Sequence, residues 1–508
     1  MSTVPRILSA ELEGIIAEPV HVEADLNVGL HSFSIVGLAD KAVTEAKERV
    51  NSALKNSGIK PPSRENRRIT VNLAPADVKK AGSRFDLPIS LSYLLASGQI
   101  EPFDTEEKMF VGELSLDGDL RPVRGALSTA LLAKELGVLE LYIPEENANE
   151  AAFVDGLSVI PVKNLRRLIA HLEGSEVIPC VPPTAFAPAY ALSRVSISDI
   201  KGQESAKRAL LIAASGGHNI LLSGPPGSGK TMLAEALASL LPPPDKGEIV
   251  EIIGIWGAMG KRYERHARPF RAPHHSASNI AILGGGTNPQ PGEISLAHCG
   301  VLFLDEFPEF HRDVLEGLRQ PLESGEVHIS RSKKTLTLPA RFMLAAAMNP
   351  CPCGYFGDAE KECTCSAHEI LRYQKRVSGP LLDRIDLQLH VPRVSFDSLR
   401  GEGDPSAERQ FRKRVLRARD FARERFARVG ISARSNAEVR AKDIENLTAL
   451  EKGAEEILKR IMEKSFISPR GYHRILKVAR TIADLEGSPT TKAPHIAEAF
   501  HYRLKANE

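Results

Sequence analysis

The segment Gly224–Thr231, with the sequence GPPGSGKT, restricts the possible folds of this chain more than any other. It follows the apolar run NILLS and precedes the helical pattern MLAEALASLL, so we expect a strand, a glycine-rich loop and a helix. Glycines let backbone N–H groups surround phosphates, and the helix N-terminus adds a favourable dipole. Lys230 is expected to reach the β- and γ-phosphates, and Thr231 to bind Mg²⁺. The segment therefore predicts a nucleotide site formed by Gly224, Pro225, Pro226, Gly227, Ser228, Gly229, Lys230 and Thr231.

Two later apolar segments end in polar residues that suit the same site. VLFL is followed by Asp305 and Glu306, and FMLAAAM is followed by Asn349. We expect Asp305 to join Thr231 in binding Mg²⁺ and Glu306 to orient an attacking water. Asn349 is placed to read the γ-phosphate or to position that water. Two carboxylates after an apolar strand also occur at ordinary turns, but together with the phosphate loop they favour an ATPase over a mere nucleotide binder.

Two arginines stand in short polar contexts between apolar runs. They are Arg384 in SGPLLDRID and Arg470 in SPRGYHR. Cations in such places can neutralise the charge that develops on a transferred phosphoryl group, and one of them could come from a neighbouring subunit. From the residues alone, each is equally compatible with a structural salt bridge.

Composition excludes several overall classes. The chain has 508 residues, of which 42% are hydrophobic and 26% charged, so disorder, collagen-like structure and coiled coil are excluded. The net charge is only +2, although residues 401–508 contain 23 Lys and Arg against 16 Asp and Glu. This basic segment suits a polyanion partner or a solvated helical face. No apolar run is long enough for a membrane span and the start lacks a signal-peptide pattern, so we expect a cytoplasmic protein without membrane association.

The pattern of elements divides the chain into four parts. Residues 1–175 alternate strand-like and helical runs, which predicts an α/β or α+β domain. Residues 176–197 are rich in Pro and Ala and predict a linker. Residues 198–395 alternate strands and helices around the nucleotide motifs. Residues 396–508 are helical only and predict a bundle or lid.

Four cysteines, Cys351, Cys353, Cys363 and Cys365, lie within the segment CPCGYFGDAEKECTC that follows Asn349. In a reducing compartment, such clustering argues for a metal rather than disulfides. Four thiolates can close a tetrahedral Zn²⁺ site. A redox-active dithiol pair and free thiols are the alternatives.

Two basic segments are candidates for DNA contact. VHISRSKKTLTLPA predicts two short strands around a turn that carries Arg331, Lys333 and Lys334, which could grip phosphates independently of sequence. The alternative is a solvated turn. RYERHARPFRAPHH mixes basic and aromatic side chains, which suits single-strand contact or a subunit interface equally. Its members are Tyr263, Arg268, Phe270, Arg271, His274 and His275.

The motifs together resemble a known family. GQESAKRAL, GPPGSGKT, VLFLDE, LRQPLESGEVHISR, AMNP, LLDRID and SPRGYHR occur in the order of the magnesium-chelatase-like AAA+ ATPases, and RPFRAPHHSAS with PGEISLAHCGVLFLDEFPEF resembles their ComM/YifB family. The resemblance implies an AAA+ core with a helical lid and hexameric rings that use ATP and Mg²⁺. It also implies that Asn349 is sensor 1, Arg384 the arginine finger acting on a neighbour, and Arg470 sensor 2. The implied activity is branch migration of DNA in natural transformation.

Residues 1–175 resemble the Lon-protease fold, in VNLAPADVKKAGSRFDLPISLSYLLASG and the GELSLDGDL segment. A Lon-type protease needs a Ser nucleophile and a Lys base. By this resemblance Asp86 stands at the Ser position and Leu127 at the Lys position, so we expect no protease dyad. The domain then serves as a scaffold or DNA-binding ring, with Lys79, Lys80 and Arg84 as phosphate contacts or as ordinary surface charge.

Three functional classes fit parts of this pattern. An ATP-dependent protease is disfavoured because Ser and Lys are missing, and a magnesium chelatase subunit is disfavoured because it lacks a Lon-like domain. We expect an ATP-dependent DNA motor, a hexameric branch-migration helicase acting on recombination intermediates in transformation or repair. The alternative is a chelatase-like or protein-remodelling ATPase that acts on a partner protein.

Overall fold

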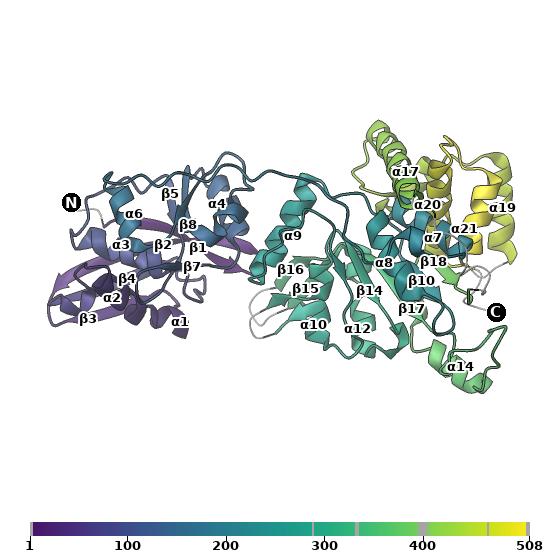
Figure 1. Cartoon of the computed structure of the whole chain (residues 1–508), viewed down its shortest axis with the longest axis horizontal. Helices are drawn as coiled ribbons and strands as arrows, with labels where there is room; N and C mark the ends of the chain where they lie inside the picture. Colours follow the sequence, from purple (N-terminus) through teal and green to yellow (C-terminus); the bar gives the residue numbers. More distant parts are fainter. Residues whose placement is uncertain are drawn as a thin grey trace. The chain divides into compact units, whose positions relative to one another are not determined.

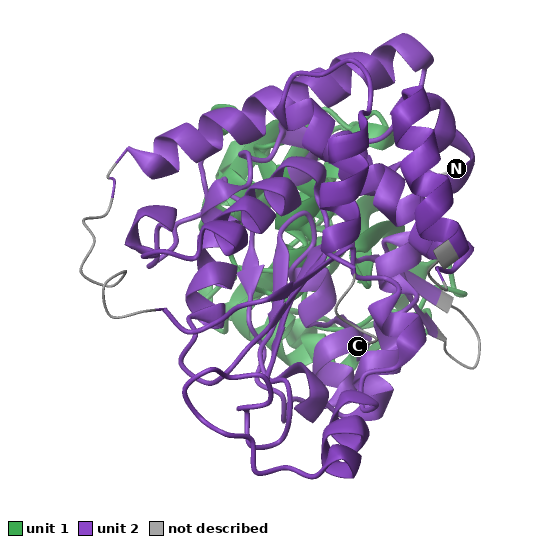
Figure 2. Cartoon of the chain, turned by 90° about the vertical axis from the view of Figure 1, so that its right-hand side faces the viewer, with its two compact units in different colours: residues 1–187, 249–264 green, residues 188–248, 265–508 purple. Residues whose placement is uncertain are grey.

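The chain forms two compact units that each combine a sheet with helices. The computed structural model describes residues 4–286, 289–330, 335–394, 404, 406–464 and 467–503 (Figure 1). One unit comprises residues 1–187 with 249–264, and the other comprises 188–248 with 265–508 (Figure 2). Residues 177–193 contain neither helix nor strand, and the division between the units falls within this segment. The prediction of an α/β protein with an α+β N-terminal domain is confirmed.

A mixed seven-stranded sheet organises the first unit, in the order β3-β4-β2-β1-β5-β8-β9. The strand β4 shows why this segment is a strand, because Ile69, Val71 and Leu73 alternate with more exposed residues and are all fully buried. The strands are β1 (Arg6–Glu13), β2 (Ile16–Val28), β3 (Ser32–Val36), β4 (Arg67–Ala74), β5 (Lys108–Phe110), β8 (Glu140–Pro144) and β9 (Ser158–Val162), with the separate pair β6 (Glu113–Leu114) and β7 (Leu120–Arg121).

Helices pack on this sheet and enclose the core of the first unit. The helix α3 is buried over nearly its whole length, which explains its almost uniformly apolar sequence DLPISLSYLLA. The helices are α1 (Lys41–Thr44), α2 (Ala46–Asn56), α3 (Asp86–Ala96), α4 (Ala126–Glu135), α5 (Glu145–Ala151), α6 (Leu165–Leu172) and the later part of α9 (Lys246–Ala258), with the 3₁₀ turn η1 (Pro62–Arg64).

A five-stranded parallel sheet organises the second unit, in the order β11-β14-β17-β10-β18. Its central strands are continuous apolar runs because helices cover both faces of a parallel sheet. The strands are β10 (Ile220–Ser223), β11 (Phe270–Arg271), β14 (Val301–Leu304), β17 (Met343–Met348) and β18 (Leu387–His390), with the separate pairs β12 (Gly284–Gly285) with β13 (Gln290–Pro291) and β15 (Glu326–Ser330) with β16 (Thr335–Pro339).

The helices of the second unit fall into a group around the sheet and a C-terminal lid (Figure 1). Around the sheet lie η2 (Ile197–Asp199), α7 (Glu204–Gly216), α8 (Lys230–Leu240), α10 (Asn279–Leu283), α11 (Glu293–Leu296), η3 (Phe307–Glu309), α12 (Arg312–Gly317), α13 (Pro321–Ser324), α14 (Ala367–Gln374) and α15 (Gly379–Leu382). The lid contains α17 (Ala407–Val429), η4 (Asn436–Glu438), α18 (Ala441–Thr448), α19 (Lys452–Lys464), α20 (Pro469–Leu485) and α21 (Ala493–His501).

The lid shares one hydrophobic core with the sheet domain. Both α17 and α20 pack against α7, and Leu210, Val415 and Leu476 belong to the same buried cluster. Several arginines of the basic C-terminal segment also act inside the molecule. Arg419 donates to the carbonyl of Ala214 over 2.8 Å, and burial lowers its pKa to about 10. The positive charge of residues 401–508 is therefore used partly in lid packing.

A buried polar network fixes the lid helices to one another. The carboxylate of Asp484, which is almost fully buried, accepts hydrogen bonds from Arg480 over 3.0 Å and from Arg425 over 2.9 Å. Asn436 donates to the same carboxylate over 2.8 Å. One carboxylate thus balances two largely buried guanidinium groups, as a buried charge requires.

In the described part of the chain, no helix combines the length and the apolar character that a bilayer span needs.

Candidate functional site

The phosphate-loop segment has the geometry that its sequence predicts. It connects β10 to α8, and Gly227 and Gly229 have φ angles of +77° and +85°. Glycine adopts such left-handed conformations without the strain of a side chain. The hydroxyl oxygen Oγ of Ser228 is buried and lacks a hydrogen-bond partner among the described residues. A bound phosphate would supply the missing partner, so the loop fits the nucleotide that the sequence predicts.

Lys230 points back into its own loop. Its Nζ atom donates to the carbonyl oxygens of Gly224 over 2.8 Å and Pro225 over 2.9 Å, and to Oδ1 of Asn349 over 3.3 Å. Burial lowers its pKa, and the nearby Asp305 opposes this effect. The ammonium group is thus held among neutral acceptors that phosphate oxygens can replace.

Thr231 and Asp305 meet as the predicted Mg²⁺ ligands. Thr231 Oγ1 donates to Asp305 Oδ2 over 2.9 Å, although the two residues come from α8 and from the end of β14. A hydroxyl and a carboxylate oxygen are ligands that Mg²⁺ prefers, usually together with phosphate oxygens and waters. The donor set therefore fits this ion.

Glu306 is paired with His275, a contact that the sequence did not predict. It has a φ angle of +52°, an uncommon conformation for a residue other than glycine, and its backbone N–H donates to Asp305 Oδ1 over 2.9 Å. Its Oε2 atom lies 2.9 Å from Nδ1 of His275. His275 belongs to the segment that follows β11, and β11 pairs with β14. The sheet order therefore brings the imidazole to the carboxylate.

Gln203 supports the loop from another direction. Its side-chain nitrogen donates to the carbonyl of Ser228 over 2.7 Å, and its φ angle is +55°. Sequence reasoning did not assign it a role. The GQESAKRAL motif, which belongs to the family pattern, is the signal that could have drawn attention to it.

The carboxyl ends of three parallel strands explain why these residues meet. Gly224 follows β10, Asp305 follows β14 and Asn349 follows β17, and all three strands run in the same direction. Ligands of open α/β sheets bind at this edge. Lys230, Thr231, Asp305, Glu306 and Asn349 are thus brought together by topology.

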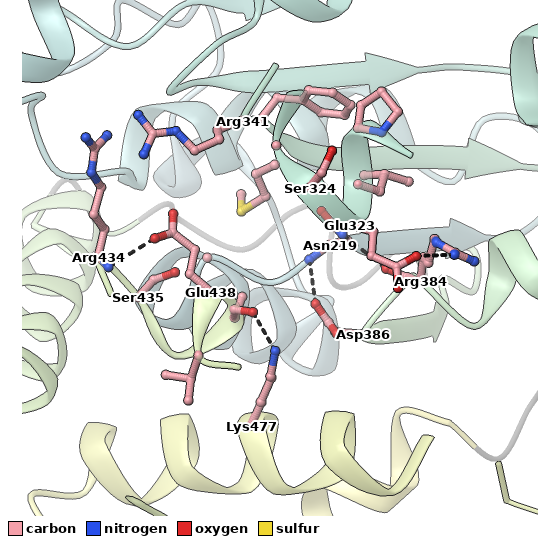
Figure 3. Close-up of a pocket in the computed structure, with 18 of the residues that line it drawn as sticks. Asn219, Glu323, Ser324, Arg341, Arg384, Asp386, Arg434, Ser435, Glu438 and Lys477 are labelled. Carbon is pink, nitrogen blue, oxygen red and sulfur yellow. Dashed lines mark hydrogen bonds and ion pairs between the residues drawn. The ribbon is translucent and has the colours of Figure 1, made fainter. Parts of the chain in front are cut away.

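Arg384 and Arg470 lie at the opposite edge of the sheet. They line a cavity of about 650 Å³ together with Asn219, which precedes β10, and Asp386, which precedes β18 (Figure 3). A strand of four residues such as β10 spans about 13 Å at about 3.3 Å per residue. Within one chain, the length of the strands therefore separates both arginines from Lys230, which lies at the carboxyl ends of these strands.

Both arginines bind the same carboxylate. Arg384 pairs with Oε2 of Glu323, and Arg470 Nη2 lies 3.3 Å from Oε1 of Glu323. The hydrogen bond from Arg384 lowers the pKa of Glu323. Arg384 is 6% exposed, and its Nε atom lacks a partner among the described residues. Among the lining side chains, the Arg384 guanidinium thus keeps one buried N–H group without a described partner.

The four clustered cysteines converge on one point. The Sγ atoms of Cys351 and Cys353 lie 3.4 Å apart, and Cys363 Sγ lies 3.6 Å from each of them. Cys365 Sγ completes a group in which all four sulfurs lie within 4.8 Å of one another. Four sulfurs about 2.3 Å from a tetrahedral zinc ion would lie about 3.8 Å apart. These thiols are unbridged, and the donor set fits zinc.

The predicted DNA contacts fall outside what can be described. β15 and β16 pair as antiparallel strands with Ser330 opposite Thr335, as the sequence predicts. Arg331, Lys333 and Lys334 connect these strands in the sequence and lie outside the described residues.

Four other cations that were expected as possible DNA contacts bind partners within the chain instead. Arg268 pairs with Glu248 over 2.6 Å, and Arg271 pairs with Glu293 over 2.6 Å. Lys80 is fully buried and Arg84 is 6% exposed, whereas Lys79 is exposed. The suggestion that Lys80 and Arg84 contact phosphates is therefore wrong, because they donate to backbone carbonyls inside the first unit.

The position expected for a protease nucleophile holds a structural ion pair. Asp86 is fully buried, and its carboxylate accepts from Arg49 over 2.7 and 2.9 Å and from the backbone of Leu114 over 3.2 Å. Burial raises its pKa to about 6. Leu127 is fully buried in α4 and has no ionisable group.

Fold and site together define a phosphate-binding-loop protein of the AAA+ class, with a five-stranded parallel sheet, a helical lid and acidic residues at the phosphate edge. Three family models match the chain. They are magnesium chelatase subunit ChlI over residues 196–399, subunit ChlI of Mg-chelatase over 22–147, and the ChlI C-terminal model over 405–503.

Comparison with individual proteins narrows the class. The chain is 45% identical over 497 residues to competence protein ComM of Haemophilus influenzae, covering 96% of this chain and 95% of that protein. It is 42% identical over 496 residues to YifB of Escherichia coli, with the same coverage. A 38 kDa magnesium-chelatase subunit of Rhodobacter capsulatus is 30% identical over 30% of this chain and 49% of its own length. The chain belongs to the ComM/YifB family of magnesium-chelatase-like AAA+ proteins.

Proposed function

We propose that this protein is an ATP-driven DNA motor that assembles as a hexameric ring and moves branch points in recombination intermediates, in natural transformation or in DNA repair. The observation that carries the proposal is the division of the catalytic residues between two edges of one sheet, in a chain that resembles a competence protein over nearly its full length.

The residues at the carboxyl ends of β10, β14 and β17 can together hydrolyse ATP. Lys230 binds the β- and γ-phosphates. Once the Glu306 carboxylate has separated from His275, it orients and deprotonates the attacking water. Asn349, already bonded to Lys230, is placed to contact the γ-phosphate. Thr231 and Asp305 would hold Mg²⁺, which would neutralise charge on the bound phosphates.

A ring explains the position of the two arginines. Arg384 and Arg470 face a cavity at the far edge of the sheet, where they cannot stabilise charge on a phosphate bound to their own Lys230. In a ring of identical subunits this edge can face the phosphate loop of the next copy. Arg384 then acts as an arginine finger and Arg470 as a second charge sensor.

DNA is the proposed substrate of the motor. The hairpin formed by β15 and β16 comes directly before β17, whose end carries Asn349. A change at the γ-phosphate can therefore be passed to the hairpin through one strand. Arg331, Lys333 and Lys334, which join the two strands in the sequence, are proposed to bind backbone phosphates, which would make binding independent of sequence and sensitive to salt.

Zinc is proposed as a structural component. The convergence of four thiols within the distances that tetrahedral zinc requires supports this assignment.

The test is the rate of ATP hydrolysis with and without single-stranded DNA and a synthetic four-way junction, at low and physiological salt. We expect stimulation by DNA that weakens with salt. Lys230→Ala and Glu306→Gln should abolish hydrolysis, and normal rates in either variant would refute the site. The double variant Lys333→Ala/Lys334→Ala should lose DNA binding while basal hydrolysis continues.

The second candidate is a chelatase-like or protein-remodelling ATPase that acts on a partner protein. The partial similarity to a magnesium-chelatase subunit favours it. A protein that hydrolyses ATP, binds no DNA and shows no stimulation by DNA would support this second candidate and refute the motor.

A further inference from the structure

The cysteine loop contacts the phosphate-binding loop directly. Gly354 follows Cys353, and a β-carbon added to Gly354 would lie 2.6 Å from Cδ and 2.8 Å from Cγ of Pro226. These distances are below van der Waals contact, so only glycine fits against this proline. Gly354 also has a φ angle of +87°, which favours glycine independently. The backbone of one loop therefore rests on the side chain of the other.

The sulfur cluster determines where Gly354 lies. The backbone N–H of Gly354 donates to the carbonyl of Cys351 over 3.0 Å, which closes a tight turn between the first two cysteines. The N–H of Cys353 donates to Cys365 Sγ over 3.4 Å, and that of Phe356 donates to Cys351 Sγ over 3.3 Å. Movement of Cys351 or Cys353 would thus carry Gly354 with it.

The same loop is continuous with the γ-phosphate side of the site. Cys351 follows Asn349 after a single proline, and Asn349 accepts the hydrogen bond from Lys230. The N–H of Gly224, the first residue of the phosphate loop, donates to the carbonyl of Met348 over 3.2 Å. The cysteine cluster therefore supports the phosphate loop at Pro226 and leads into Asn349.

We propose that zinc bound by Cys351, Cys353, Cys363 and Cys365 holds the phosphate-binding loop in its nucleotide-binding conformation through Gly354 and Pro226, so that occupancy of the metal site sets the affinity for ATP. This inference rests on the proposed binding of ATP and zinc, and not on the DNA activity. The binding of structural zinc is coupled to the folding of the loop that supplies its ligands. Without the metal, the turn at Gly354 loses its anchor.

Two glycines of the same loop provide a matched pair of variants. Gly354→Ala places a methyl group against Pro226. Gly357→Ala introduces the same change at a φ angle of +76°, where no atom of the described residues lies within 4 Å of the added carbon. Any difference between the two variants reports the contact with Pro226 and not the strain of alanine at positive φ.

The experiment uses the full chain without DNA. It measures zinc content by inductively coupled plasma mass spectrometry, and it measures affinity for a fluorescently labelled ATP analogue in the presence of Mg²⁺. We expect about one zinc per chain in the wild type, Gly354→Ala and Gly357→Ala. Gly354→Ala should bind the nucleotide about tenfold to a hundredfold more weakly, because a small displacement of a binding loop has effects of this size. Gly357→Ala should bind like the wild type.

Removal of the metal tests directly whether zinc occupancy changes the affinity for the nucleotide. Cys363→Ser and the wild type stripped by a chelator should both lose affinity for the analogue, and added zinc should restore it only in the wild type. A wild type that contains no zinc would overturn the proposal. Equal affinity in Gly354→Ala, zinc-free protein and wild type would overturn it as well. Failure of DNA to stimulate hydrolysis would refute the motor and leave these binding results intact.

Discussion

His275 Nδ1 lies 2.9 Å from Glu306 Oε2, so the carboxylate proposed to orient the attacking water is engaged by an imidazole from the segment after β11. The Glu306 side chain is 57% exposed, and the ring of His274 lies 4.1 Å from that of His275. The carboxylate is therefore held by a partner that is itself near the surface, where a ligand or a neighbouring subunit can displace it.

His275→Ala should release Glu306 and raise ATP hydrolysis in the absence of DNA. A hydrogen bond worth about 1 kcal/mol corresponds to a shift of about fivefold in the available carboxylate. The measurement is the steady-state rate of phosphate release with and without DNA. The control is His274→Ala, because His274 bonds to Ser276, and among the contacts of the described residues the imidazole that pairs with Glu306 is that of His275. An unchanged basal rate in His275→Ala would show that the pair does not restrain Glu306.

Mixing two inactive variants should restore hydrolysis if Arg384 serves the neighbouring subunit. Arg384→Ala alone should bind ATP and hydrolyse it about a thousandfold more slowly, as expected when an arginine finger is lost. Lys230→Ala alone should not bind ATP. In a mixed ring, the interface between an intact Lys230 and an intact Arg384 is complete, so phosphate release should exceed that of either variant. Activity no greater than the sum of the separate variants would place Arg384 in a structural role.

Asp484→Ala should strongly destabilise the second unit. Its carboxylate balances Arg480, which is fully buried, and Arg425, whose side chain is 12% exposed. Removing one partner of a buried ion pair typically costs about 3–5 kcal/mol, because the remaining charge is left without compensation. The unfolding of the second unit, followed by calorimetry, measures this effect.

The control for Asp484 is Asp420→Ala in α17. Asp420 pairs with Arg423 over 3.0 Å, but their side chains are 59% and 77% exposed. Exposed pairs contribute little, so this variant should unfold like the wild type. Similar destabilisation of both variants would contradict a special role for the buried network.

Asp386 should make the second unit sensitive to acid. Burial acts to raise its pKa, but the charge of Arg474 and the interaction with the His218 imidazole outweigh burial and hold the pKa below its ordinary range. A carboxyl whose folded pKa is lowered stabilises the fold above its unfolded pKa of about 3.9, and this contribution is lost as pH falls toward the folded pKa. Asp386→Asn should therefore unfold at lower temperature than the wild type near neutral pH.

The difference in unfolding temperature between Asp386→Asn and the wild type should become smaller below about pH 4, because the wild-type carboxyl then begins to lose its charge-dependent stabilisation of the fold. Calorimetric midpoints across the acid range measure it. A difference that stays constant with pH would mean that Asp386 acts through packing and not through its charge.

Local sequence was sufficient wherever neighbouring residues carry the function. The loop from Gly224 to Thr231 needs only its glycines, the strand before it and the helix after it. Asp305 and Asn349 could be placed because the carboxyl ends of parallel strands share an edge. Cys351 to Cys365 could be grouped because 15 residues of chain easily bring their sulfurs together. The family pattern added the ordering of these parts along the chain.

Tertiary structure alone decided which charged residues are available. Lys79 and Lys80 are adjacent in sequence, yet one is exposed and the other fully buried. Arg268, expected to contact single-stranded DNA or a neighbouring subunit, pairs with Glu248. Glu306 meets His275 through the pairing of β11 with β14.

The sequence by itself therefore determined the nucleotide loop, the cysteine cluster and the family, because each depends on residue types at short spacing. Only the tertiary structure decided that Gly354 rests on Pro226, that Arg384 and Arg470 share Glu323 at the far edge of the sheet, and that His275 holds Glu306. The physical reason is that these contacts depend on distances between strands and loops that are remote in sequence, and a side chain's burial and charge partner are fixed only when those elements pack.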